Sequence, residues 1–163
     1  MTHIERAFLK SPIGYIEVTC SEAGLRTLSF LDFRVKIQKT PHKLVEVVRQ
    51  LKDYFDGKLL AFDLPLDPEG SEFQKKVWKE VAKIPFGKTI SYQDLAKKVG
   101  DPKAFRAVGG ANGKNPLSVI IPCHRVIGAN GRLTGYEFGL WRKKWLLEHE
   151  NAFLQKDLFY KGV

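Results

Sequence analysis

The stretch with the most chemical potential in this 163-residue sequence is Cys123-His124-Arg125, which places a thiol next to an imidazole and a guanidinium. A cysteine is nucleophilic only as the thiolate, and a neighbouring cation or imidazole lowers a thiol pKa into the working range. Adjacent side chains do not point the same way on a helix or a strand, so proton transfer from Cys123 to His124 requires a turn or a bridging water. Taken alone, the Cys-His pair favours the alternative of a small buried thiol beside a surface imidazole.

The residues around this segment predict the helices that must position it. Capping and stop signals indicate helical segments from Ser71 to about Pro85, over Tyr92–Val99, from Lys103 to about Gly110, and over Leu140–His149. Ser71 with Gln74 resembles a capping box, Ser91 caps the second segment and Gly100 stops it. A short helix, a tight turn and another short helix on a basic background are typical of a helix-turn-helix, whose second helix enters a DNA groove. Many unrelated helix pairs share this pattern.

The first part of the chain predicts a small sheet with one helix. Ser11-Pro12 marks a turn between two segments, and the second of these alternates in polarity. The expected strands cover Arg6–Lys10, Ile13–Thr19, Leu25–Leu31 and Leu59–Leu64. A helix opens at Pro41, shows apolar residues at three- and four-residue steps, and ends at Gly57.

The charge of the chain changes at a cluster of Pro65, Pro68 and Gly70. Residues 1–69 carry 10 basic and 10 acidic side chains, so the whole net charge of +9 lies in residues 70–163. We therefore expect two domains with these bounds, of which the second binds a polyanion, with nucleic acid first in line. The alternative is a surface that lysine merely keeps soluble.

Other classes of protein fit the sequence poorly. No stretch approaches the ~18 apolar residues of a membrane span. The residues from Met1 to Arg6 show no apolar signal-peptide region, so a cytoplasmic protein is expected. Cys20 and Cys123 are too few for a disulfide framework, and no paired Cys/His spacing suggests zinc. Free thiols and no metal are the simplest expectation, with Cys20 a buried strand thiol.

The segment Pro122-Cys123-His124-Arg125-Val126 resembles the signature of the O6-alkylguanine-DNA alkyltransferases, also called methylated-DNA–protein-cysteine methyltransferases. Agreement in identity and spacing extends over about residues 72–150, through Ser91-Tyr92, Arg106–Ala111, Asn115-Pro116, Gly135-Tyr136 and Leu146–Glu150. The first 70 residues resemble the variable N-terminal domain of that family only in their strand–helix pattern. The resemblance implies an α/β (α+β) fold with a small antiparallel sheet and helix, followed by a winged-helix-like helix-turn-helix domain.

The resemblance also implies an activity, which is DNA repair by direct reversal of damage. The alkyl group of an O6-alkylguanine, and in some cases of an O4-alkylthymine, would pass irreversibly to Cys123. A soft thiolate attacks such an sp3 carbon without a metal or cofactor, and the protein is consumed in one event. The implied partner is double-stranded DNA carrying the lesion, bound by a monomer. The alternative is a non-catalytic alkyltransferase-like lesion-binding protein; such proteins lack the cysteine. A winged-helix regulator would leave Cys123 unexplained.

The family's catalytic roles carry over to five residues of this chain. By resemblance, Cys123 is the nucleophile, His124 is its base through a water, and Glu150 orients the imidazole. Asn115 would hold the active-site turn, and the Tyr92 hydroxyl would donate a hydrogen bond to the base.

DNA contacts are implied for a second set of residues. Arg106 would replace the extruded nucleotide in the base stack, and Tyr92 would crowd the adjacent phosphate. Small residues on the recognition helix, such as Ala107 and Gly110, would permit close approach in the minor groove, although a tight helix–helix contact selects the same residues. Lys103 and Arg125 complete this set.

The expected substrate pocket is lined by Val126, Tyr136, Glu137, Phe138 and Lys143. Lys143 lies where the family has a proposed proton-relay lysine, whereas a solvated lysine on a helix face is the alternative. The family commonly has a small residue after the pocket tyrosine. Phe138, and with it Glu137, would therefore narrow the pocket, unless the loop folds outward and Phe138 packs on Trp141.

Overall fold

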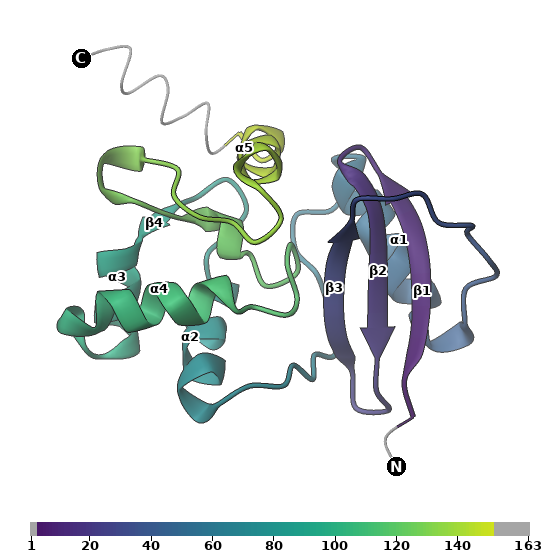
Figure 1. The fold of residues 1–163 in the computed structure, drawn as a ribbon, viewed down its shortest axis with the longest axis horizontal. Coiled ribbons are helices and arrows are strands. Elements are labelled where there is room, and N and C mark those ends of the chain that lie inside the picture. Colours follow the sequence, from purple (N-terminus) through teal and green to yellow (C-terminus); the bar gives the residue numbers. More distant parts are fainter. Residues whose placement is uncertain (1–2, 152–163) are drawn as a thin grey trace. The chain divides into compact units, whose positions relative to one another are not determined.

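The computed structural model describes residues 3–151, which fall into two units (Figure 1). The first unit comprises the chain up to Glu69 together with Pro116–Ser118, and the second comprises Gly70–Asn115 and the chain from Val119 onward. The segment 116–118 thus belongs with the first unit, although the sequence-based division assigns it to the second domain. Residues 152–163, also assigned to that domain, lie outside the described residues.

A three-stranded antiparallel sheet forms the centre of the first unit. It has the order β1 (Glu5–Ser11), β2 (Gly14–Cys20) and β3 (Leu25–Leu31), as the alternating sequence predicts. The β1–β2 register runs from Ser11↔Gly14 to Glu5↔Cys20. Gly14 has φ +117°, which an L side chain rarely adopts, so glycine allows this tight turn. The segment Pro116–Ser118 joins the unit at β3, where the Leu28 amide donates to the Pro116 carbonyl at 2.8 Å.

The helix α1 (Val45–Phe55) covers one face of this sheet and follows a 3-10 turn, η1 (His42–Leu44) (Figure 1). Its buried face includes Leu51, which is fully buried, and Tyr54, which is 1% exposed. Such an apolar stripe is what the predicted three- and four-residue spacing buries against a sheet.

The strand expected over Leu59–Leu64 does not form. The backbone of Asp63 is instead bound at both its amide and its carbonyl by the side chain of Gln50, at 3.0 and 3.1 Å. These hydrogen bonds satisfy the groups that a neighbouring strand would otherwise pair with. An isolated bridge between Leu25 and Leu66 is the nearest approach to a further strand.

Short helices dominate the second unit. They are α2 (Glu72–Ala82), α3 (Tyr92–Val99), α4 (Phe105–Gly113) and α5 (Leu140–His149), with η2 (Pro102–Ala104) before α4. The predicted capping box of Ser71 and Gln74 is confirmed, as is the Ser91 cap, whose hydroxyl accepts from the Asp94 amide at 3.0 Å. Gly100 ends α3 at φ +109°, so α3 and α4 form the predicted helix-turn-helix.

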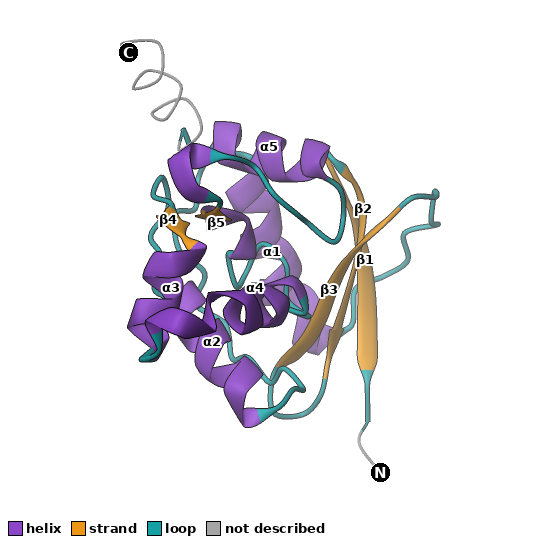
Figure 2. Cartoon of the chain, turned by 60° about the vertical axis from the view of Figure 1, so that its left-hand side comes forward, coloured by secondary structure: helices purple, strands orange, loops and turns teal. Residues whose placement is uncertain are grey.

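Two very short strands, β4 (Ile90–Ser91) and β5 (Val126–Ile127), pair in parallel beside α3 (Figure 2). Two further 3-10 turns, η3 (Cys123–Arg125) and η4 (Ala129–Gly131), flank β5. The pairing therefore brings the residues before α3 next to those that follow the cysteine. No helix within residues 3–151 is long and apolar enough to cross a membrane.

Candidate active site

A tight turn presents Cys123. Pro122 has φ −81° and ψ 64°, and the Cys123 amide donates to the Ile121 carbonyl at 2.7 Å, which are the features of an inverse γ-turn. The η3 turn follows at once, with the Arg125 amide on the Pro122 carbonyl at 2.9 Å. Cys123 is thus the first residue of η3, and its side chain and that of His124 are neighbours in one 3-10 turn. Cys123 is 6% exposed.

Two asparagines at the end of α4 hold this turn. The Asn115 side-chain amide donates to the Ile121 carbonyl at 2.8 Å, and the Asn112 amide donates to the Cys123 carbonyl at 3.3 Å. Both side chains are buried. Asn112 was not singled out from the sequence, because an asparagine near a helix end is usually a cap and its acceptor here is a backbone group.

His124, Arg125 and Glu150 form a buried network next to the thiol. His124 Nε2 lies 2.8 Å from Glu150 Oε2, and Arg125 reaches the same carboxylate through Nε at 2.7 Å and Nη2 at 2.9 Å. Arg125 Nη1 donates to the Ile84 carbonyl at 2.6 Å. His124 is fully buried and Glu150 is 1% exposed, so water does not screen this network.

The network favours a neutral imidazole against an ionised carboxylate. Burial lowers the pKa of His124, although Glu150 acts in the opposite direction. Burial alone would raise the pKa of Glu150, but His124 and Arg125 together hold it well below its usual range. With Nε2–H donated to Glu150, the Nδ1 of His124 is left as a proton acceptor. This atom is buried and has no hydrogen-bond partner within residues 3–151.

The structure places Arg125, which the sequence analysis groups with the DNA contacts, in the buried network. Its side chain is 6% exposed, and its Nε, Nη1 and Nη2 atoms all donate to Glu150 or to the Ile84 carbonyl. A guanidinium in this position compensates a buried carboxylate instead. Arg125 therefore positions Glu150, which in turn orients His124.

Lys143 is buried, contrary to the alternative of a solvated lysine. Its ammonium donates to the carbonyls of Val126, Thr134 and Gly135 at 2.8, 2.9 and 3.3 Å, so all three N–H groups are used. Burial lowers its pKa from 10.5 to about 8, against the opposing effect of the Cys123 thiolate. Lys143 thus fastens the loop after η4 to β5.

Tyr92 meets the same loop from the start of α3. Its hydroxyl donates to the Thr134 carbonyl at 3.3 Å, and its ring lies 5.9 Å from Lys143 Nζ. A Cβ added to Gly109 would lie 3.5 Å from this ring, which is ordinary contact. Thr134, which the sequence did not single out, is therefore the point where Tyr92 and Lys143 converge.

The loop residues predicted to line a pocket lie between η4 and α5. Phe138 is half-buried and stands edge-on to the Tyr136 ring, with centroids 6.3 Å apart. Its carbonyl accepts from Arg142 Nη1 at 3.1 Å, and Glu137 is exposed. Phe138 thus packs within this loop on Tyr136, which directly follows Thr134 and Gly135.

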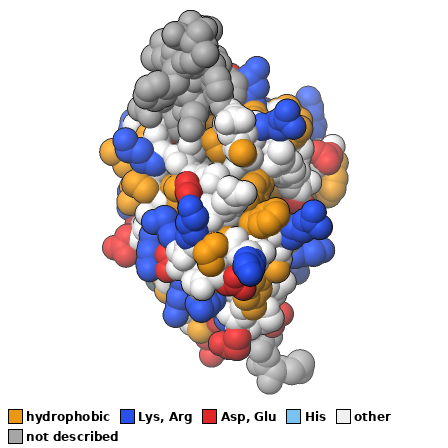
Figure 3. Space-filling model, turned by 90° about the vertical axis from the view of Figure 1, so that its left-hand side faces the viewer, with side chains coloured by type: hydrophobic (Ala, Val, Ile, Leu, Met, Phe, Trp, Pro, Cys, Tyr) orange, Lys and Arg blue, Asp and Glu red, His pale blue; other side chains and the backbone are white. Residues whose placement is uncertain are grey.

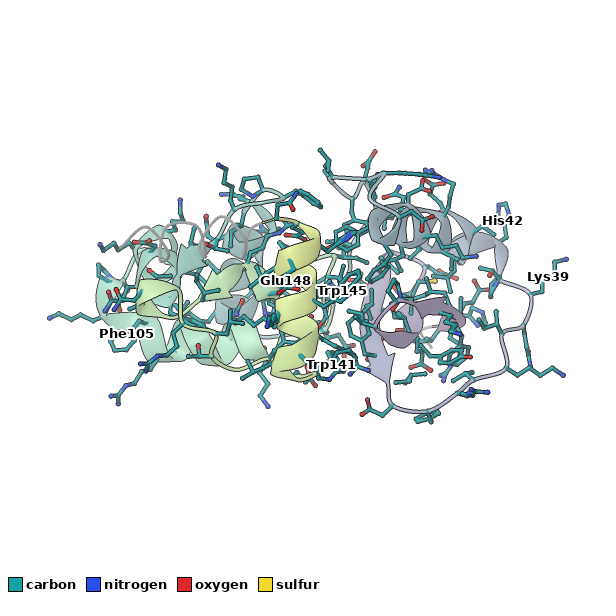
Figure 4. The ribbon with its side chains drawn as sticks, turned by 90° about the horizontal axis from the view of Figure 1, so that it is seen from above. Lys39, His42, Phe105, Trp141, Trp145 and Glu148 are labelled. Atoms are coloured by element: carbon teal, nitrogen blue, oxygen red, sulfur yellow. The ribbon has the colours of Figure 1, made fainter. Side chains whose placement is uncertain are left out.

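The η2 turn and the exposed side of α4 carry the remaining predicted DNA contacts, with Lys103 on η2. Lys103, Arg106, Ala107 and Gly110 are all exposed, and a Cβ at Gly110 would meet nothing within 4 Å. For Ala107 and Gly110, the alternative of a tight helix–helix contact therefore does not apply. Figure 3 shows Lys and Arg side chains spread around exposed hydrophobic ones on the side of the α3–α4 pair, and Figure 4 shows Phe105 projecting at the start of α4.

A helix-turn-helix with a basic surface and a turn that holds a thiol next to a His–Glu pair defines a class of protein. The members of this class are DNA-binding proteins that carry their own nucleophile.

Comparison with known proteins identifies the family within this class. Residues 72–152 match the DNA binding domain, and residues 4–68 the ribonuclease-like domain, of the 6-O-methylguanine DNA methyltransferase family. The methylated-DNA–protein-cysteine methyltransferase of Methanosarcina acetivorans is 48% identical over 153 residues, which cover 90% of this chain and 97% of that protein. The protein of that name from Methanosarcina mazei is 50% identical over 154 residues, with the same coverage. The chain belongs to this family.

Solved structures agree with this assignment. The crystal structure of the Mycobacterium tuberculosis O6-methylguanine methyltransferase matches with a TM-score of 0.83 and 42% identity, over 92% of this chain and 94% of that one. The M. tuberculosis OGT in complex with DNA matches with a TM-score of 0.80 and 44% identity, over 90% and 92% of the two chains. The predicted fold class is confirmed by these matches and by the elements described above.

Proposed function

We propose that this protein repairs DNA by transferring the alkyl group of O6-alkylguanine to Cys123, once per chain. The observation that carries the proposal is the buried Cys123 turn beside the His124–Glu150 pair, in a chain whose relatives over 90% of its length are methylated-DNA–protein-cysteine methyltransferases. Those names and the presence of Cys123 weigh against a non-catalytic lesion-binding protein.

The buried network supports a defined sequence of bond changes. The Cys123 proton passes through a water to Nδ1 of His124, while Glu150 stabilises the imidazolium that forms. The thiolate attacks the alkyl carbon in line, so that an S–C bond forms as the C–O6 bond breaks and the electron pair leaves on the guanine oxygen. The Tyr92 hydroxyl then exchanges its hydrogen bond to the Thr134 carbonyl for one to the departing base. A thioether does not hydrolyse, so the chain is not regenerated.

The two units divide this work, and the scaffold role given below to residues 1–69 concerns the alkyl transfer and the contacts to the lesion. We assign DNA binding and alkyl acceptance to residues 70–163, and a scaffold role to residues 1–69. In the second domain, Arg106 enters the base stack as the nucleotide leaves it, and Ala107 and Gly110 permit close approach of α4 to the duplex. A nucleophilic thiol must stay reduced, which fits a cytoplasmic monomer with free cysteines.

Mass spectrometry of the intact protein tests the function directly. After mixing with an oligonucleotide that holds one O6-methylguanine, the chain should gain one methyl group and no more. Cys123→Ala should gain none. Cys20→Ala is the matched control, because it removes the other thiol and should still gain one. Continued turnover, or methyl gain in Cys123→Ala, would refute the proposal.

Phe138 is expected to limit the size of the alkyl group. The Phe138 ring lies next to Tyr136, where we expect it to narrow the path of a base past Thr134. Phe138→Gly should therefore react with O6-benzylguanine at least about tenfold faster than the wild type. A tenfold change in rate corresponds to a steric clash of about 1.4 kcal/mol. Its reaction with methylated DNA should change little. Equal benzylguanine labelling rates in the two proteins would show that Phe138 does not border the pocket.

A further inference from the structure

The first unit carries a basic arm, which we define as residues 33–43, between β3 and α1. No Asp or Glu occurs between Asp32 and Glu46, although residues 1–69 as a whole balance to zero. The basic side chains of the arm are exposed, and they are Arg34, Lys36, Lys39, His42 and Lys43. Part of the positive charge of residues 1–69 is therefore concentrated on this segment, and the acidic residues that balance it lie elsewhere in the unit.

The arm's cations differ from the arginines elsewhere in the same unit. Those arginines are paired with carboxylates, namely Arg6 with Glu17, Arg26 with Asp67, and Arg49 with Asp53. By contrast, Arg34, Lys36 and Lys39 form no ion pair with any carboxylate in residues 3–151. Their field is not offset by a local partner and is directed into solvent.

The backbone of the arm is also available to a ligand. Residues 33–40 form neither helix nor strand, and none of them makes a backbone–backbone hydrogen bond within the described part of the chain. Phe33 is 65% exposed and Ile37 is 48% exposed, so the arm is not packed down by its apolar residues. Figure 4 shows Lys39 and His42 at one edge of the first unit, with the Lys39 side chain extending from the backbone.

We propose that residues 33–43 form a second DNA-contacting surface, which binds backbone phosphates whether or not a lesion is present. This inference rests on the proposed function, because that function makes a polyanion the substrate. Cations and free amide N–H groups are the usual phosphate ligands, and such contacts carry no sequence information. A protein partner would have to be acidic to match these cations, whereas DNA already supplies the complementary charge.

A pair of matched double variants of the full chain tests the arm. Lys36→Gln/Lys39→Gln removes two lysines from it, and Lys52→Gln/Lys58→Gln removes two exposed lysines from elsewhere in the same unit. Affinity is measured by fluorescence anisotropy over a range of salt concentrations, for one duplex with and without O6-methylguanine. The rate of methyl transfer is measured at saturating DNA.

The arm variant should bind both duplexes more weakly by the same factor, about tenfold at low salt, and the slope of log affinity against log salt should fall by about 2. Its transfer rate at saturation should equal that of the wild type, and the control pair should change neither affinity nor slope. Equal losses in the two double variants, no loss, or a loss confined to the lesion duplex would each overturn the proposal.

A protein-docking role would give a different result. In that case the sedimentation coefficient of the Phe33→Ser/Ile37→Ser variant would differ from that of the wild type. The Lys36→Gln/Lys39→Gln variant would keep the DNA affinity of the wild type. Transfer to Cys123 in the wild type is scored separately by intact mass, so failure of the proposed function and failure of the arm are distinguishable.

Discussion

Replacing Glu150 by Gln is expected to lower the free energy of unfolding by about 3–5 kcal/mol, because the change leaves a buried guanidinium without its counter-charge. Arg125 binds the carboxylate through two nitrogens and is 6% exposed, so water does not substitute for the lost oxygen. His124 also loses the anion that orients it, so methyl transfer should slow even where the variant is folded. Urea unfolding and single-turnover transfer measure the two effects.

The double variant Arg125→Met/Glu150→Gln separates the causes. It removes the buried positive charge together with its partner and should recover part of the free energy of unfolding. Replacing both members of a buried ion pair destabilises a protein less than removing one member and leaving the other charge unpaired. Transfer should stay slow, because the imidazole still lacks its carboxylate. A double variant no more stable than Glu150→Gln would show that packing, not charge, dominates.

The same pair predicts a dependence of stability on pH. The native pKa of Glu150 lies well below its unfolded value of 4.5, so between the two the unfolded chain binds a proton that the native chain does not. The contribution of Glu150 is therefore fully present above pH 4.5 and is lost as the pH falls below it. The stability gap between wild type and Glu150→Gln should narrow over that range, and a constant gap would contradict the linkage.

Replacing Arg106 by Ala is expected to slow repair of duplex DNA by about 30- to 150-fold, the rate equivalent of the ~2–3 kcal/mol needed to unstack a base without a replacement. Free O6-methylguanine has no stack to leave, so the rate of its reaction should be unchanged. Arg106 is exposed on α4, and its loss should leave the unfolding free energy within ~0.5 kcal/mol of the wild type.

Two controls make the Arg106 result specific. Arg106→Lys keeps the charge but loses the planar group that stacks, so it should resemble Ala in rate. Lys103→Gln removes a nearby charge and should weaken binding without slowing transfer at saturating DNA. Equal slowing on the duplex and on the free base would assign Arg106 to the chemistry instead of to the extrusion of the base.

Local signals in the sequence predicted most of the fold. The alternation in β1–β3, the Ser71 and Ser91 caps and the Gly100 stop depend on residues within a few positions of one another. The prediction of a strand over Leu59–Leu64 was wrong because the contacts that decide this segment are not local. Its backbone groups are bound by Gln50, a distant side chain whose reach no local pattern reveals.

The site divides in the same way. Cys123 and His124 stand together in a sequence motif, and their partner Glu150 followed from the family resemblance. The burial of Arg125 and Lys143 did not follow, because charged residues near a helix or turn are usually solvated. Asn112 and Thr134 act through backbone carbonyls, which every residue has, so their contacts leave no trace in residue types.

The burial of Cys123 has a consequence for how the protein survives until it is needed. A chain that reacts only once is lost if its thiol meets an alkylating agent or an oxidant in free solution. At 6% exposure, Cys123 presents little surface to such agents, whereas DNA binding delivers a base directly into the site. Selectivity against wasteful reactions is thus set by access, before any chemical recognition of guanine begins.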